Sequence, residues 1–249
     1  MKIRATGRNL AILGAAVVLL AGCASNDDKG TSGAAPATTT SAAPADNGVA
    51  ALEPAAIVAK AKAALKTAKS FHMKGAINDQ GQETALDLKI SGSDVVGSMT
   101  VSKAKIELLR VGGKQYMKPD AAFWKMTAAA QADTIIQVVG DRWVIVPASN
   151  KDLGGLFTVT DVDQLLDPDG ALTKGPVKPV NGTPAISLVD GGSDGGTLYV
   201  ATTGEPYPLK LAGPTAADGG LDFTEFGETF SDIKAPAAAD TLDLSKIGA

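Results

Sequence analysis

Polar and hydrophobic residues alternate through much of the chain after residue 71. Over residues 86–90, leucine and isoleucine alternate with aspartate and lysine, and residues 95–101 repeat the pattern. A period of two is typical of strands with one buried face. Four further strands, separated by turns rich in glycine, aspartate and proline, are predicted at 184–189, 196–201, 207–211 and 221–226.

The clearest turn lies at Gly112 and Gly113. Two consecutive glycines supply the positive φ angles of a two-residue hairpin turn. Because each cross-strand pair stabilises by only about 0.2–1 kcal/mol, this hairpin is expected to belong to a larger sheet. Pairing across the turn places Val111 opposite Lys114, Leu109 opposite Tyr116, Leu108 opposite Met117 and Glu107 opposite Lys118.

Other segments have a helical period. Residues 54–69 place apolar side chains at i, i+4, i+8 and i+11, and most of the lysines lie elsewhere. An apolar stripe predicts a second helix over 128–139. Thr160 is the expected N-cap of a short third helix, since two aspartates follow it in the first turn. Between these helices, residues 143–146 are expected to form a strand that ends at Pro147.

The order of these elements shows no alternation of strand, helix and strand. Consecutive strands joined by short turns are typical of an antiparallel sheet. We therefore predict an α+β fold, in which a curved antiparallel sheet carries helices on one face. Residues 51–249 have the length of a single domain.

The chain begins with the three parts of an export signal. A basic start precedes an apolar run of 12 residues over 10–21, and small residues then lead to Cys23. This run is shorter than the about 20 residues that cross a bilayer, and it fits a signal peptide. The arrangement resembles the bacterial lipobox, in which a diacylglycerol is attached to the cysteine. We predict a signal peptide over 1–22 and lipid attachment at Cys23; the alternative is a secreted protein with an unmodified thiol.

Residues 23–50 are predicted to be the lipidated cysteine and a disordered tether. They are small and polar, with no large apolar side chain before Val49, so they cannot bury a core. A flexible chain of this length spans on the order of 30 Å. Residues 38–41 are either plain linker or a site of O-glycosylation. Signal cleavage leaves 20 basic and 27 acidic residues, which changes the net charge from −4 to −7. Membrane attachment is therefore expected to rest on acyl chains.

Composition argues against most common sites. One histidine and one cysteine exclude a disulfide framework and Cys/His zinc sites, and the acidic balance disfavours nucleic acid. Asp161 and Asp163 do not follow the spacing of a calcium loop. No G-x-S-x-G motif accompanies His72, although a hydrolase using that histidine is an alternative. We expect no catalytic residue, no metal, no cofactor and no enzymatic activity.

Several segments together resemble a known family. These are the lipobox, the polar tether, and residues 70–75, 115–118, 123–125 and 141–147. Their arrangement resembles that of the actinobacterial LppX/LprG-type lipoproteins and, more distantly, of the LolA/LolB lipoprotein carriers. The resemblance covers nearly the whole chain and is one of arrangement and composition.

This resemblance implies a half-barrel sheet around helices, with an apolar cavity that receives acyl chains. Exposing a 16-carbon acyl chain to water costs about 0.8 kcal/mol per methylene, or roughly 12 kcal/mol for the chain. Binding the chain in such a cavity offsets this cost. The same side chains would otherwise fill a solid core. The candidate lining residues are Leu86, Leu88, Ile90, Met99, Val101, Ile135, Ile136 and Val139.

The implied function is that of a membrane-anchored lipoprotein outside the cytoplasm. It would bind and shield the acyl chains of a lipid or glycolipid, and its own acyl chains would hold it on the outer face of the cell membrane. The alternative is an envelope sensor or scaffold that uses the same fold to bind a protein partner. Neither function needs a cofactor or a catalytic residue.

We expect mass spectrometry of the membrane-extracted protein to find an acylated peptide that begins at Cys23. Acylation follows from the position of the only cysteine directly after the apolar run and its small residues. An unmodified thiol at this position would contradict the prediction.

Overall fold

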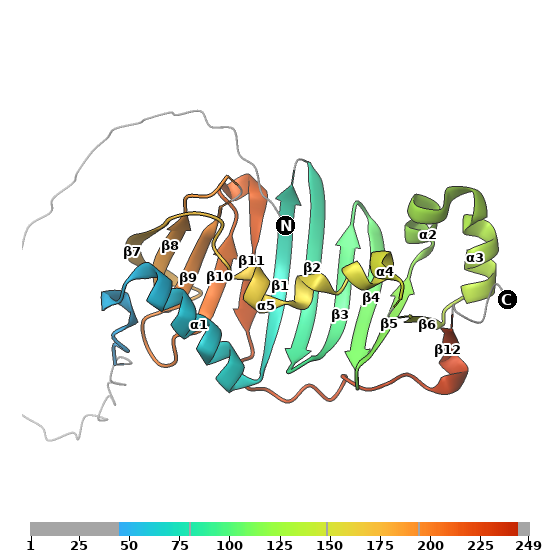
Figure 1. The fold of residues 1–249 in the computed structure, drawn as a ribbon, viewed down its shortest axis with the longest axis horizontal. Coiled ribbons are helices and arrows are strands. Elements are labelled where there is room, and N and C mark those ends of the chain that lie inside the picture. The colour runs from blue at the N-terminus through green and yellow to red at the C-terminus, as the bar shows by residue number, and fades with distance from the viewer. Residues whose placement is uncertain (1–44, 80, 148, 194, 244–249) are drawn as a thin grey trace, which may run out of the picture. The chain divides into compact units, whose positions relative to one another are not determined.

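The computed structural model describes residues 45–79, 81–147, 149–193 and 195–243. Within these ranges the chain forms one open sheet in the strand order β12-β6-β5-β4-β3-β2-β1-β11-β10-β9-β8-β7 (Figure 1). Neighbouring strands are antiparallel, except that β12 runs parallel to β6. The predicted α+β class is confirmed, with a large antiparallel sheet and a few helices.

The described elements have the following bounds. The strands are β1 (Ser70–Asp79), β2 (Gln82–Ser91), β3 (Asp94–Val101), β4 (Ala104–Val111), β5 (Lys114–Pro119), β6 (Trp143–Val146), β7 (Leu172–Val180), β8 (Thr183–Asp190), β9 (Thr197–Ala201), β10 (Pro208–Ala212), β11 (Gly219–Thr224) and β12 (Thr241–Asp243). The α-helices are α1 (Pro54–Ala68), α2 (Ala121–Ala128), α3 (Ala132–Val139), α4 (Lys151–Gly155) and α5 (Val162–Leu165). Short 3-10 helices are η1 (Val49–Ala51), η2 (Ala129–Gln131), η3 (Thr158–Thr160), η4 (Ala216–Asp218) and η5 (Ala238–Asp240).

The hairpin of β4 and β5 has the predicted register. Both turn glycines have positive φ angles, 58° at Gly112 and 75° at Gly113. The glycine pair therefore fixes which side chains of these strands face each way. Val111 pairs with Lys114, Leu109 with Tyr116, Leu108 with Met117 and Glu107 with Lys118.

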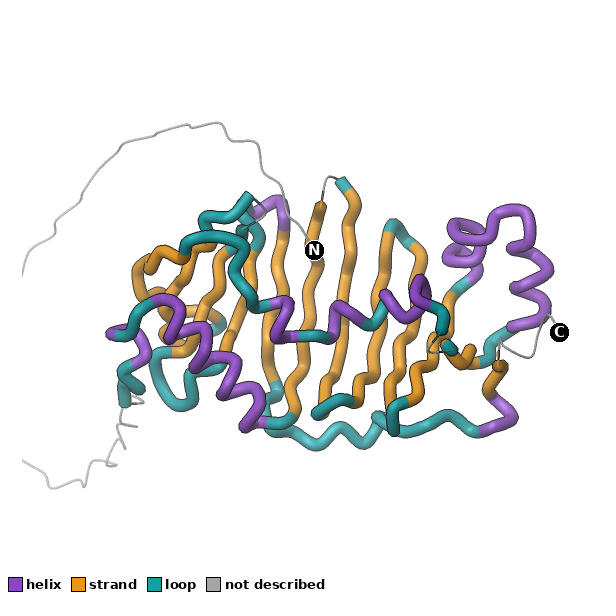
Figure 2. Tube along the Cα trace, in the orientation of Figure 1, coloured by secondary structure: helices purple, strands orange, loops and turns teal. Residues whose placement is uncertain are grey.

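Alternation gives the sheet an apolar inner face and a more polar outer face. On β2, Leu86, Leu88 and Ile90 are buried on the inner face, whereas Asp87 and Lys89 point outward. The inner face is covered by α1 and by residues 151–166, which we call the crossing segment because they run across the strands (Figure 2). Helices α2 and α3 lie at one end of the sheet, next to β5 and β6 (Figure 1).

Two helix predictions need correction. The helix predicted over 128–139 is α3, which begins only at Ala132, because residues 129–131 form a 3-10 turn after α2. The N-cap of α5 is Asp161, whose carboxylate accepts a hydrogen bond from the Gln164 N–H; Thr160 is buried, and its hydroxyl donates to the Phe157 carbonyl. In the described part of the chain, no helix is both long and apolar enough to span a membrane.

The sequence prediction missed β7 and placed the start of the folded chain too late. Strand β7 contains Pro176 and Pro179, which an edge strand tolerates because one side of its backbone has no partner. Asp46 pairs with Thr203 in an isolated bridge, and Val49 is buried. Residues 46–50, predicted as tether, therefore belong to the folded chain.

A long irregular segment returns the chain from the middle of the sheet to its edge. Residues 225–240, which we call the C-terminal strap, follow β11 and end at β12 (Figure 1). The strap is fixed at its start because the Gly227 N–H donates to the Ser70 carbonyl and the Ser70 hydroxyl donates to the Glu228 carbonyl. At its other end the strap leads into β12, where Thr241 pairs with Trp143 of β6.

Gly97 is required by the close approach of β2 and β3. It pairs with Leu88 and has a φ of 152°, and an added Cβ would lie 2.0 Å from the Asp87 carbonyl oxygen. A Cβ at Gly155 would have no heavy atom within 4 Å. The two glycines therefore make a matched pair for substitution.

We expect Gly97→Ala to lower the free energy of unfolding by about 1–3 kcal/mol, because the methyl group forces the two strands apart. Gly155→Ala should change it by less than about 0.5 kcal/mol. Urea unfolding of both variants measures the difference. Equal stabilities would contradict the close packing of β2 against β3.

Candidate functional site

The inner face has a cleft of about 450 Å³, which we call the inner cleft. It lies between the end of α1, the sheet and the crossing segment. Sites for small molecules commonly have volumes of about 300–1,000 Å³. Its lining residues are Lys62, Leu65, Lys66, Lys69, Phe71, Ile90, Gly92, Arg110, Gln115, Gly154, Phe157, Thr158, Thr160, Asp161, Val162 and Asp163.

The inner cleft has an apolar floor. Leu65 of α1, Phe71 of β1 and Ile90 of β2 are each at most 5% exposed. Phe157 and Val162 add apolar surface from the crossing segment. These residues come from α1, the sheet and the crossing segment, and they belong to one hydrophobic core. The cleft is therefore a gap between the elements that cover the inner face.

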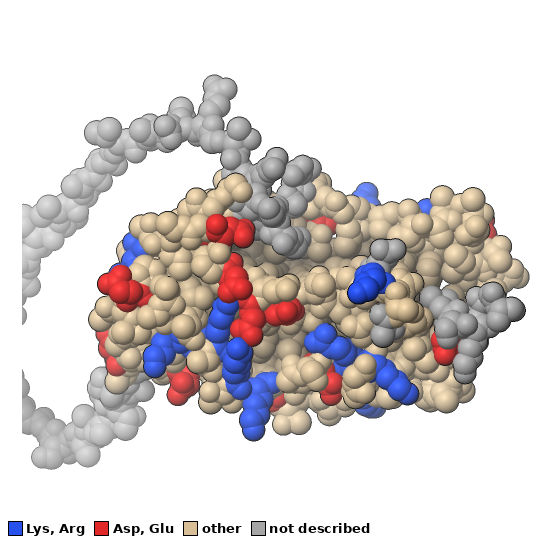
Figure 3. Space-filling model, viewed as in Figure 1, with Lys and Arg blue, Asp and Glu red and all other residues tan. Residues whose placement is uncertain are grey.

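The rim of the cleft carries more cations than acids. Lys62, Lys66, Lys69 and Arg110 line it, against Asp161 and Asp163. Basic and acidic side chains lie side by side on this face of the molecule (Figure 3).

Two ion pairs fasten α1 to the crossing segment and to the turn after it, along this rim. Lys62 pairs with Asp167 and also donates to the Asp163 carbonyl oxygen. The Lys66 ammonium lies 2.9 Å from the Asp163 carboxylate. Asp161 is occupied as the N-cap of α5.

A smaller cavity of about 150 Å³ lies under α1 on the other half of the sheet. Val58, Ile77, Leu188 and Leu198 contribute apolar walls, and the turn after α5 adds aspartates at its mouth. Its volume is below the usual range for a small-molecule site. We therefore take the inner cleft as the candidate site.

The structure places most of the predicted cavity residues in the hydrophobic core. Ile90 alone among them lines the inner cleft. Leu86, Leu88, Met99 and Val139 are buried in the core. The remaining three, Val101, Ile135 and Ile136, are partly buried and pack against that core.

The other lining residues of the cleft were not predicted as cavity residues, among them Lys69, Arg110, Gln115 and Phe157. Arg110 had a detectable signal, since it continues the inner-face row of Ile106 and Leu108 where an apolar residue is expected. Cys23, the signal peptide and residues 38–41 lie outside the described residues.

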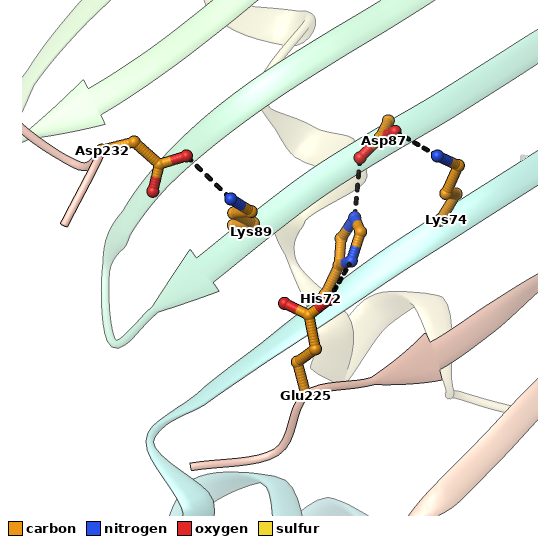
Figure 4. Close-up of polar contacts among 6 residues, drawn as sticks. All are labelled: His72, Lys74, Asp87, Lys89, Glu225 and Asp232. Atoms are coloured by element: carbon orange, nitrogen blue, oxygen red, sulfur yellow. Dashed lines mark hydrogen bonds and ion pairs between the residues drawn. The ribbon is translucent and has the colours of Figure 1, made fainter. Parts of the chain in front are cut away.

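His72 lies on the outer face, away from the inner cleft, within a network of charged residues (Figure 4). Its Nε2 is 2.6 Å from an Asp87 oxygen and its Nδ1 is 3.2 Å from a Glu225 oxygen. A neutral imidazole has one N–H, so only the protonated ring donates to both carboxylates. The contact links β1, β2 and the start of the C-terminal strap.

Two carboxylates of this network have a lowered pKa. Burial alone would raise the pKa of Asp87, but hydrogen bonds from Lys74 and His72 outweigh it and hold the pKa below its usual value of 3.8. The hydrogen bond from Lys89 lowers the pKa of Asp232 in the same way. That bond also raises the pKa of Lys89, whose ammonium lies 5.5 Å from the centre of the Phe230 ring.

Comparison with known proteins finds similarity at the level of structure. No protein-family model matches the chain, and no curated protein matches it. LprF from Mycobacterium bovis superposes with a TM-score of 0.49 and 15% identity, over 74% of this chain and 97% of LprF. An uncharacterized conserved protein from Thermus thermophilus gives a TM-score of 0.40 and 11% identity, over 76% of this chain and 98% of that one.

A third similar structure is a chain of the MucA/MucB complex of Pseudomonas aeruginosa. Its TM-score is 0.39 at 15% identity, and the match covers 76% of this chain and 62% of that chain. These similarities concern the fold.

We expect the lowered pKa values on the outer face to make the protein sensitive to acid. A carboxylate with a depressed pKa in the folded protein stabilises it fully above the ordinary value of 3.8 and loses this effect as the pH falls through the folded pKa. The urea midpoint should therefore fall less steeply in Asp87→Asn than in the unsubstituted protein as the pH falls below about 4.

Asp141→Asn is the control for this experiment, because Asp141 is exposed and has no ion pair within the described ranges. Its pH profile should follow that of the unsubstituted protein. An Asp87→Asn profile of the same steepness would contradict the prediction.

Proposed function

We propose that the protein is a membrane-anchored, extracytoplasmic lipoprotein that binds and shields the acyl chain of a lipid or glycolipid in its inner cleft. The observation that carries this proposal is the apolar floor of the cleft beneath a charged rim. An acyl chain on that floor would leave water, and each methylene so buried contributes about 0.8 kcal/mol. The rim would stay in contact with a polar headgroup.

The proposed anchor is the acylated Cys23 on the outer face of the cell membrane. Two acyl chains suffice for stable attachment, whereas a single chain gives marginal binding. Envelope lipid transport would then need no catalytic step, and we include in the proposal that the protein is not an enzyme. Binding of a protein partner by the same fold is the competing outcome of the test below.

We expect lipid to co-purify with the full-length protein and to be lost when the cleft is filled. A Cβ at Gly154 would lie 3.9 Å from the Gln115 side-chain oxygen, within the cleft. Gly154→Phe therefore places an aromatic ring in the space proposed for the acyl chain. Mass spectrometry of organic extracts of the natively purified protein measures bound lipid.

Gly155→Phe is the matched control, because the neighbouring Gly155 does not line the cleft and a Cβ there meets no heavy atom within 4 Å. It should retain stoichiometric lipid, whereas Gly154→Phe should lose most of it. If the unsubstituted protein and both variants were all purified without lipid, the proposal would be overturned and a partner-binding role would be favoured.

A further inference from the structure

Lys69 occupies a strained backbone position at the end of α1. Its φ is 67°, in the left-handed region where a residue other than glycine is uncommon. Its N–H donates to the Leu65 carbonyl, and its own carbonyl accepts a hydrogen bond of 2.7 Å from the Gly92 N–H. The backbone is thus tied to the turn between β2 and β3. A lysine where glycine is the easier residue points to a use for the side chain.

Arg110 approaches the same turn from the sheet. It is half-buried on the inner face of β4, where it pairs with Val95 and Gln115. Its Nε donates to the Ser93 carbonyl. In the described part of the chain, the terminal nitrogens of its guanidinium have no protein acceptor, so most of its five N–H donors are available to a ligand.

These two cations share one end of the inner cleft. The backbone carbonyl of Lys69 is bonded to Gly92 and the Arg110 side chain to Ser93, so both residues flank the turn from Ser91 to Asp94, and both line the cleft. Over the described ranges, no carboxylate lies within 4.0 Å of either side chain. The other two lysines of the rim are already paired with aspartates of the crossing segment and the turn after it.

The carboxylate next to this turn is occupied elsewhere. Asp94 accepts a hydrogen bond of 3.2 Å from the Gly112 N–H and does not line the cleft. The end of the cleft between Lys69 and Arg110 therefore keeps two positive charges that no acidic group of the described chain neutralises. The apolar floor of Phe71 and Ile90 begins directly beside them.

We propose that the ligand of the inner cleft is an anionic amphiphile, whose phosphate, sulfate or carboxylate binds between Lys69 and Arg110 while its chain lies on the apolar floor. This inference rests on the proposed function and adds the charge of the headgroup to it. A guanidinium binds such oxyanions through two parallel hydrogen bonds, and an ammonium adds a third contact. Each charge-assisted contact strengthens binding by about tenfold.

Three detergents with the same chain and different headgroups test the charge. The full-length chain with Cys23→Ser, which cannot be acylated, is titrated calorimetrically with dodecyl phosphate, dodecyl phosphocholine and dodecyl maltoside below their micelle concentrations. We expect dodecyl phosphate to bind at least about tenfold more tightly than the other two. Inorganic phosphate is titrated separately and should bind much more weakly than dodecyl phosphate.

Substitutions locate the anion site. Lys69→Gln combined with Arg110→Gln should abolish the preference for dodecyl phosphate over dodecyl maltoside. Lys69→Arg combined with Arg110→Lys keeps both charges and should keep a preference. Lys114→Gln is the control, because it removes one positive charge from the start of β5, outside the cleft. Thermal unfolding confirms that each variant is folded.

The outcomes separate this inference from the proposed function. If all three detergents bound with equal affinity, the inference of an anionic headgroup would be overturned, whereas the proposal of acyl-chain binding would stand. If inorganic phosphate bound as tightly as dodecyl phosphate, the site would bind a soluble anion, and the inference that its ligand is an amphiphile would be wrong. If no detergent bound, the proposed function would fail together with this inference.

Discussion

The structure depends on the burial of the apolar inner face of its sheet. Alternation places Phe71, Met73, Leu88 and Ile106 on that face, and each is at most 5% exposed. An open sheet cannot close on itself to bury this surface, so other elements must cover it. In the described chain, α1 covers the half of the sheet that contains β7 to β11, and the crossing segment runs across the middle strands (Figure 2). The inner cleft lies where these two covers meet incompletely.

The two covers are held to the sheet more by burial than by charge. Leu65 of α1 and Phe157 and Leu166 of the crossing segment are nearly inaccessible to solvent. The ion pair between Lys66 and Asp163 has both side chains more than half exposed, and pairs of this kind contribute little. Helices α4 and α5 have five and four residues, too few to be stable without the core beneath them. These two short helices therefore depend on the buried side chains of the crossing segment for their stability.

Much of the sheet could be predicted because its signals are local. The alternation on β2 and β3 and the glycine pair at Gly112 and Gly113 determine strand, face and register within a few residues. Strand β7 was missed because Pro176 and Pro179 are typical of a loop unless the strand is known to lie at an edge. That position depends on the order of all twelve strands in the described sheet, which no local pattern contains.

The cleft could not be predicted for a related reason. Hydrophobic periodicity identifies the residues that leave water, and Leu86, Leu88 and Met99 do so. It does not say whether these residues contact other side chains or a ligand. In this fold they pack against other side chains of the core. The site appears where polar residues interrupt the apolar rows at one end of the sheet, with Arg110 and Gln115 as directly paired neighbours on β4 and β5. Arg110 is half-buried in this otherwise apolar row, and its Nε donates to the Ser93 carbonyl. The interruption of an inner-face row is therefore a better guide to this site than the row itself.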